Sequence, residues 1–414
     1  MKKFVYLFVL GLLPFFSSCS SDDDGRDSDN PGTISMSVEE KSLVESANNG
    51  FAINLFKSVA KANEGRNFVI SPLSVTCNMS MLAVGADGGT RAEIMNMLGY
   101  DATSIDAVNE MNRKFMQETP RLDGKTKIEI ANLLLVDKGF GVLDSYSDKL
   151  KTFYRADKKT ADFADMAGTV DIINNWCNTK TNGMIPELFA KGSNVDFLGL
   201  TLLNAVYFKG IWADKFDKSE TKAEPFRLES GGDMSVSMMH RKGEYGYNEN
   251  GLCKMVNLPY GNGSFSMVVM LPNAGRTVAE VIEAMTKDKW QNDLASMSKE
   301  IVDLHMPKFT VVYNDFIENS IRNLGARQMF TTAADFKNMV ANGAFNVGFV
   351  KHAVKIIVDE EGTEAAAVTG TGDILGPNPN DVKVFYADRP FIYAIVENST
   401  GQIYFVGTYV GKAV

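Results

Sequence analysis

The segment from Val358 to Thr369 combines residue types that favour a loop able to become a strand. It begins as a strand, breaks at Gly362 and continues through small residues. Side chains of a strand alternate between its two faces. One face would carry only small or β-branched side chains, those of Thr363, Ala365, Ala367, Thr369 and Thr371. Glu364 falls on the other face, in water, so the pattern indicates a loop that later enters a sheet.

The sequence contains no evident catalytic or metal-binding constellation. Its three histidines stand far apart, at positions 240, 305 and 352, and no Gly-x-Ser-x-Gly, His-Glu-x-x-His or Cys-x-x-Cys motif occurs. Glycines at 370, 372 and 376 have the wrong spacing for a phosphate loop, and Asp373 would repel a phosphate. We therefore expect that the protein is not an enzyme, needs no metal or other cofactor, and works by conformational change.

Helices that could position such a loop are predicted along the body. A serine–proline pair at 71–72 is typical of a helix N-cap, which predicts a helix through Val84. Thr90 and Glu93 have the spacing of a capping box, which predicts a helix over 91–98.

Apolar stretches predict the strands, at 128–136, 200–208, 256–260, 266–271, 391–396 and 402–410. Gly261 and Gly263 indicate a hairpin between the third and fourth of these. Strands and helices are mixed without βαβ regularity, which favours an α+β fold.

Composition and charge exclude some partners. The chain has 414 residues, 45% of them hydrophobic, and a net charge of −9. A nucleic-acid surface or a polyanion site would need clustered lysine and arginine residues. We therefore expect neither kind of site. Cys77, Cys177 and Cys253 give no disulfide framework, and Cys77 fits a buried thiol. We expect a monomer.

Residues 1–18 resemble a bacterial lipoprotein signal peptide. Two lysines precede an apolar run over 4–16 that is too short to span a bilayer, and small residues lead to Cys19. Lipid would be attached at Cys19; an ordinary secretory signal cut nearby is the alternative. Residues 19–40 are expected to form a flexible tether, with an acidic patch at 22–24 similar to a surface-export signal. This predicts anchoring in the outer membrane of the cell envelope, surface-exposed or facing the periplasm.

Five blocks of sequence resemble the serpin family, and they occur in the same order as in that family. The loop segment above resembles the hinge of the reactive loop of inhibitory serpins. The other blocks are Asn67–Ser74, Asn204–Trp212, His305–Phe309 and Phe385–Phe391. On this resemblance, which spans the chain from about residue 45, the chain is identified as a member of the family.

The resemblance implies a fold and a set of functional residues. The fold is α+β, with three β-sheets, a large central sheet A surrounded by about eight or nine helices, and an exposed reactive loop at about 360–383. Residues 41–414 would form one domain. The hinge of the loop would comprise Glu360, Glu361, Gly362, Thr363, Glu364, Ala365, Ala366 and Ala367. The shutter, where the sheet opens, would comprise Ser71, Ser74, Asn204 and His352, and the breach at its top Trp212, Lys308 and Glu360.

The family's spacing also suggests the bond offered to a protease. Fifteen residues counted from Gly362 inclusive place the residue before that bond at Gly376. Pro377 follows, and proline at that position blocks most serine proteases. We therefore predict cleavage at Leu375–Gly376, with the next bond upstream and a site nearer Val368 as alternatives.

The loop composition restricts the target protease. No lysine or arginine lies between Lys355 and Lys383, which disfavours trypsin-like enzymes. Elastase-like or chymotrypsin-like proteases fit Leu375 better, and papain-like cysteine proteases stay open. Asp373 would point into the sheet after full insertion, which is a poor fit.

By resemblance, the expected function is that of a suicide substrate. A protease would cut the loop, become linked to it as an acyl-enzyme, and be trapped as the loop inserts into sheet A. A non-inhibitory serpin, a binding or storage protein that is only cleaved, is the first alternative. A surface enzyme or structural lipoprotein is the second, and only the signal peptide supports it.

Overall fold

The computed structural model describes residues 30–193, 195, 197, 199–341, 345–362 and 382–411. The α-helices in this part of the chain are α1 (Val38–Leu43), α2 (Asn49–Ala62), α3 (Pro72–Gly85), α4 (Gly88–Met97), α5 (Ile105–Glu118), α6 (Asp144–Tyr154), α7 (Met166–Lys180), α8 (Val278–Ala284), α9 (Lys287–Ala295) and α10 (Glu318–Asn323). Short 3₁₀ or π turns are η1 (Val44–Asn48), η2 (Thr119–Arg121), η3 (Lys218–Glu220) and η4 (Gln328–Phe330). None of the described helices is long and apolar enough to cross a membrane.

Hydrogen bonds group the strands into three sheets. A nine-stranded sheet has the order β1-β14-β13-β8-β7-β6-β9-β12, with β5 on β6; a three-stranded sheet has the order β3-β2-β4; and β10 pairs with β11. The strands are β1 (Phe68–Ile70), β2 (Thr126–Asp137), β3 (Asp157–Ala161), β4 (Leu200–Gly210), β5 (Lys222–Arg227), β6 (Asp233–Glu249), β7 (Cys253–Tyr260), β8 (Phe265–Pro272), β9 (Ser298–Pro307), β10 (Phe309–Phe316), β11 (Lys351–Val358), β12 (Lys383–Tyr386), β13 (Phe391–Glu397) and β14 (Ile403–Tyr409). The predicted α+β class and serpin architecture are confirmed.

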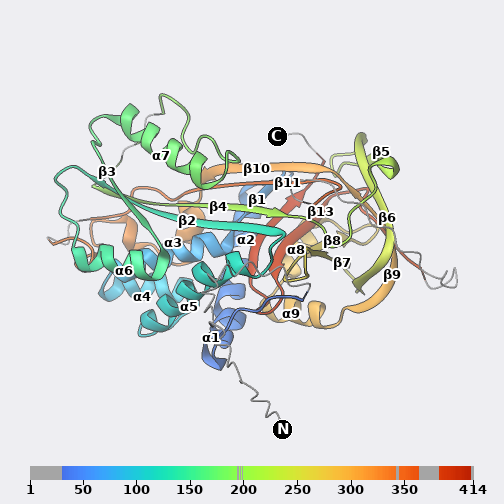
Figure 1. The fold of residues 1–414 in the computed structure, drawn as a ribbon, viewed down its shortest axis with the longest axis horizontal. Coiled ribbons are helices and arrows are strands. Elements are labelled where there is room, and N and C mark those ends of the chain that lie inside the picture. Colours follow the sequence, from blue (N-terminus) through green and yellow to red (C-terminus); the bar gives the residue numbers. More distant parts are fainter. Residues whose placement is uncertain are drawn as a thin grey trace, which may run out of the picture.

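The strands β2, β4, β11 and β10 lie side by side, with α7 on one face and α3 on the other (Figure 1). Alternate residues of β2 enter different cores. Leu134 and Val136 belong to the main core with α3, whereas Leu133 and Leu135 pack in a smaller core with Ile173 of α7. This layer is therefore buried on both faces around residues 133–136, which explains the run of four apolar residues there.

Most predicted elements are present, with shifted ends. Ser71 caps α3 by accepting a hydrogen bond from the backbone of Ser74, as its sequence indicates. The helix predicted over 91–98 begins three residues earlier, with Asp87 at its N-cap position. The capping-box prediction for Thr90 is wrong, because its buried hydroxyl accepts a hydrogen bond from the backbone of Asp335 instead.

The packed body begins before the predicted boundary at residue 41. Ile34 is buried, and its backbone N–H donates to the Ser399 hydroxyl. The N–H of Gly32 donates to Ser264, and Ser37 and Glu40 form a capping box for α1. Residues 30–40, predicted to belong to the tether, therefore pack against the domain through the apolar side chains of Ile34 and Met36 and through backbone hydrogen bonds.

Candidate functional site

The central feature of the site is a gap between two neighbouring strands. β2 pairs with one edge of β4 and β10 with one edge of β11, and the other edges of β4 and β11 face each other (Figure 1). Within the described residues no hydrogen-bonded ladder joins β4 to β11, so the two parts belong to different sheets. We call these two parts, β3-β2-β4 and β10-β11, the split sheet. Each edge offers a row of backbone groups that another strand could pair with.

The two edge strands run parallel. Just beyond their carboxyl ends, Ile211 and Gly362 form an isolated antiparallel bridge, and the N–H of Trp212 donates to the Glu361 carbonyl at 2.9 Å. The carboxyl ends of β4 and β11 therefore lie at the same end of the gap. A strand returning from β11 into the gap would run antiparallel to both neighbours.

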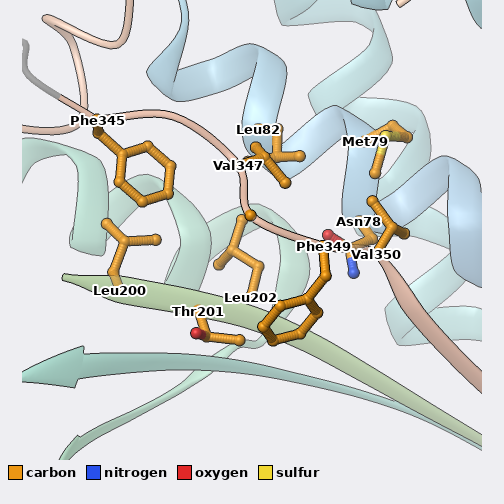
Figure 2. A pocket seen from close by; sticks show the side chains of 11 residues that line it. Asn78, Met79, Leu82, Leu200, Thr201, Leu202, Phe345, Val347, Phe349 and Val350 are labelled. Carbon is orange, nitrogen blue, oxygen red and sulfur yellow. The ribbon is translucent and has the colours of Figure 1, made fainter. Parts of the chain in front are cut away.

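At its other end the gap contains a small cavity (Figure 2). Residues 345–350, which lead into β11, form no strand there. Val347 of this segment lies beside Leu82 of α3, whereas Phe349 points the other way and lies beside Leu202 of β4. The cavity has a volume of about 30 Å³, so the native packing is incomplete where the two parts meet.

The four predicted shutter residues are brought together at the start of α3. His352 of β11 accepts a hydrogen bond from the Ser71 backbone through Nε2, at 3.0 Å. Asn204 of β4 accepts one from the Ser74 hydroxyl. Both edge strands are thus hydrogen-bonded to the N-terminus of α3. A hydrogen bond from the Ser74 backbone to the Ser71 hydroxyl connects the two contacts. Moving β4 away from β11 would require at least one of the two hydrogen bonds, that of His352 or that of Asn204, to be exchanged for another partner.

Burial holds the His352 imidazole neutral. It lowers the pKa of His352 from 6.5 to about 4, because the charged form would lose its hydration. The neutral ring can then use Nε2 as the acceptor for the Ser71 N–H.

At the top of the gap the chain turns sharply through residues 359–362, which we call the hinge turn. The N–H of Asp359 donates to the Gly362 carbonyl at 2.9 Å, and the N–H of Gly362 donates back at 3.2 Å. Gly362 also bridges Ile211. The reversal that would lead a strand into the gap has therefore already begun at Gly362.

Glu360 is held by the predicted partner. Lys308 Nζ lies 2.7 Å from Glu360 Oε2, and the Thr221 hydroxyl donates to Oε1 at 2.8 Å. Burial raises the pKa of Glu360, but these hydrogen bonds to the charged form outweigh it and hold the pKa below the ordinary value. Trp212 lies beside them and donates its indole N–H to the Asp359 carbonyl at 2.9 Å. The three breach residues are therefore in one place.

Glu361 has partners that the sequence did not suggest. Lys215 Nζ lies 2.6 Å from Oε2 and Lys218 Nζ lies 2.9 Å from Oε1. The hydrogen bonds from these two lysines lower the pKa of Glu361. Both lysines lie in the irregular segment after β4, where no motif signals a role; their spacing of three from each other is the only hint in the sequence.

Only glycine fits at position 362. Its φ of +139° lies in a region that residues with side chains rarely adopt, and an added Cβ would stand 2.1 Å from the Gly210 carbonyl oxygen. The close approach of the hinge turn to β4 therefore depends on the missing side chain.

The remaining predicted site residues lie outside the described part of the chain. They are Cys19, Thr363, Glu364, Ala365, Ala366, Ala367, Leu375 and Gly376. The loop, the reactive bond and the lipid anchor therefore stay predictions.

Sequence reasoning also missed the polar chain below the shutter. Asn132 of β2 accepts a hydrogen bond from Asn204 Nδ2 at 2.7 Å and donates to the Tyr154 carbonyl at 2.7 Å. Asn132 is the one amide within the apolar run of β2, which is a signal that could have found it. A buried amide in such a strand needs partners.

A split sheet with the hinge turn at one end of its gap is the distinctive feature of this fold, and comparison with known families identifies the class of protein. The model of the family described as Serpin (serine protease inhibitor) matches residues 46–411. The chain therefore belongs to the serpin family.

Individual relatives resemble it over nearly their whole length. A serine protease inhibitor of Cyanea capillata is 31% identical over 368 residues, covering 87% of this chain and 97% of the relative. Leukocyte elastase inhibitor A of Rattus norvegicus is 30% identical, with 88% and 98% covered. Among solved structures, the thermophilic serpin tengpin in its native state is 30% identical with a TM-score of 0.81, covering 92% and 97%. Human thyroxine-binding globulin, at 23% identity and a TM-score of 0.82 over 91% and 100%, is similar in fold alone.

The geometry at Gly362 predicts a steric effect of a single methyl group. Gly362→Ala should lower the midpoint of thermal unfolding of the uncleaved protein, because the Cβ would force the hinge turn away from β4. Gly325→Ala is the matched control, since Gly325 has a φ of +120° but no atom within 4 Å of the added Cβ. Backbone strain should cost about 1–3 kcal/mol in either variant. The steric effect is therefore the amount by which Gly362→Ala lowers the unfolding midpoint more than Gly325→Ala does. Equal losses in the two variants would contradict it.

The buried imidazole predicts a loss of stability in acid. The folded protein keeps His352 unprotonated down to about pH 4, whereas the unfolded chain binds the proton below about 6.5. The contribution of the neutral imidazole to the free energy of unfolding is therefore complete above pH 6.5. It falls by about 3 kcal/mol as the pH drops from about 6.5 to about 4. His352→Gln, which retains an acceptor, should lose less stability between pH 7.5 and 4.5 than the original protein does. Urea unfolding at both pH values measures this, and parallel losses would show that His352 does not titrate as described.

Proposed function

We propose that this serpin inhibits proteases as a suicide substrate, trapping them in a covalent acyl complex by inserting its cleaved loop between β4 and β11. The observation that carries the proposal is that no ladder joins the parallel strands β4 and β11 within the described residues, while a chain reversal at one end of the gap has already begun at Gly362. Insertion of a reactive loop into its own sheet is an established form of strand addition in serpins.

The energy for such a trap is available in the gap. An inserted strand would run antiparallel to both β4 and β11, so it could make ladder hydrogen bonds on both sides. About 14 residues at ~3.3 Å each would carry the acyl end roughly 45 Å along the sheet. At about 0.5–1.5 kcal/mol net for each bond, insertion could release on the order of 10 kcal/mol or more.

The sequence after the hinge turn supports insertion over simple cleavage. Thr363, Ala365 and Ala367 would face the buried side of the sheet, where small side chains meet little resistance. Bulky or charged residues there would slow insertion and favour hydrolysis of the acyl-enzyme. The resemblance to a leukocyte elastase inhibitor accords with a target that prefers apolar residues, and Leu375 before Gly376 fits the pocket of such a protease.

We also propose that the protein acts at the cell envelope, anchored through lipid on Cys19 after removal of residues 1–18. The support is the order of positive, apolar and small residues before that cysteine. From there it would shield the cell from external proteases.

Denaturing electrophoresis tests the inhibitory function. The protein is incubated separately with an elastase, a chymotrypsin-like protease, trypsin and papain, and released peptides are identified by mass spectrometry. The expected result is a covalent band at the summed mass with one of the apolar-preferring enzymes, and a released peptide that begins at Gly376. Cleavage by every enzyme without such a band, and without a rise in thermal stability, would favour the non-inhibitory alternative.

A pair of hinge variants tests the insertion step itself. Thr363→Arg should abolish the covalent complex while the loop stays cleavable, because a guanidinium would have to enter the buried face first. Glu364→Arg is the matched control, since position 364 would face water after insertion, and it should retain most of the inhibitory rate. The ratio of complex to cleaved inhibitor on the gel measures both. Equal inhibition by the two variants would exclude an insertion in which position 363 faces the buried side of the sheet and position 364 faces water.

A further inference from the structure

Two histidines that are far apart in the sequence lie opposite each other on neighbouring strands. His240 of β6 and His305 of β9 are register partners, and their rings stack with centroids 4.4 Å apart. Asp303 precedes His305 by two residues on β9, so its side chain leaves the same face of the sheet. On the other side of β9, Tyr386 of β12 pairs with His305.

Both imidazoles direct Nε2 to one carboxylate oxygen. His240 Nε2 lies 2.7 Å from Asp303 Oδ1, and His305 Nε2 lies 3.5 Å from the same atom. Only the first distance is that of a good hydrogen bond, so a hydrogen bond to Asp303 does not account for the orientation of His305. A cation shared by all three groups would account for it.

The spacing suits a tetrahedral ion. One ligand atom from each of the three residues lies within 4.8 Å of the other two. Ligand atoms bound at ~2.0–2.1 Å around a tetrahedral ion stand about 3.3 Å apart. The three groups therefore need to move by only about 1 Å or less to reach that geometry.

The surroundings provide what such a site requires. The three side chains are 34%, 34% and 23% exposed for His240, Asp303 and His305, so an ion can enter and water can take the fourth position. Glu220 Oε2 stands 4.0 Å from His240 Nδ1, behind the ring. A carboxylate in that place commonly orients a metal-bound histidine.

We propose that His240, Asp303 and His305 form a binding site for Zn²⁺ on the face of β6 and β9. Two imidazoles and one carboxylate are ligands that Zn²⁺ accepts, whereas Mg²⁺ and Ca²⁺ prefer oxygen ligands throughout. The site is independent of the proposed inhibitory function.

The position of the site links it to the supports of the hinge turn. Three residues after His305, the chain reaches Lys308, which pairs with Glu360. Glu220 belongs to the same short turn, η3, as Lys218, which pairs with Glu361. A bound ion would therefore fix both segments that hold the hinge turn, and it should raise the stability of the uncleaved protein.

Calorimetric titration of the purified full chain with ZnCl₂ tests the site. We expect one ion per chain, no heat of binding with MgCl₂, and a midpoint of thermal unfolding that rises by several degrees with Zn²⁺ and returns with a chelator. Co²⁺, titrated separately, should give the intense visible absorption of a tetrahedral complex.

Substitutions locate the ion. His240→Gln and Asp303→Asn should each weaken the Kd for Zn²⁺ by at least about tenfold. Asp233→Asn, an identical change at an exposed position on the same strand as His240, should leave it unchanged. Thermal unfolding without metal checks that each variant is folded, and if one ligand variant does not fold, the other decides. Absence of Zn²⁺ binding, or an unchanged Kd in a folded ligand variant, would overturn the proposal.

Discussion

The structure depends on one constraint, the need of backbone groups at the edges of β4 and β11 for hydrogen-bond partners. Within the described residues, each strand forms a ladder on one side, over its whole length, with β2 or β10. Their other edges face each other without a ladder, and the segment before β11 leaves a small cavity beside β4. Within the described residues, the sheet is therefore short of one strand, and the chain that could supply it starts at the end of the gap.

Polar contacts hold the two sides of the gap at two places. At the shutter, two hydrogen bonds tie β4 and β11 to the first turn of α3. At the hinge turn, two carboxylates are bonded by three lysines. Hydrogen bonds of this kind can be exchanged between alternative partners at little net cost, whereas separating an apolar interface would expose it to water. Such ties fit the opening that the proposed insertion would require.

Sequence reasoning reached those parts of the site that carry local signals or a family motif. Ser71 was identifiable as a helix cap, and Lys308 with Glu360 by resemblance; the structure places them as expected. Lys215 and Lys218 were missed because their partner Glu361 is almost 150 residues away, and no local pattern encodes the pairing. The histidines 240 and 305 looked scattered for the same reason, since only the register of β6 against β9 brings them together. Residues 30–40 have the composition of a tether, and their packing depends on the buried side chains of Ile34 and Glu40 and on backbone groups whose partners the composition cannot reveal.

The hinge carboxylates differ in exposure from the cations that hold them. The side chains of Glu360 and Glu361 are only 5% and 8% exposed, whereas Lys308 and Lys218 are 39% and 64% exposed. Such lysines can return to water without a large penalty, but the carboxylates would lose their partners if they stayed buried. The proposed insertion would therefore either leave these ion pairs in place or carry both carboxylates outward together, and in either case Gly362 lies between the charged turn and the small residues that follow it in the sequence. The charges and the glycine would then have complementary roles: the ion pairs hold the turn against the body, and the glycine permits the close approach to β4 from which the chain beyond it would enter the gap.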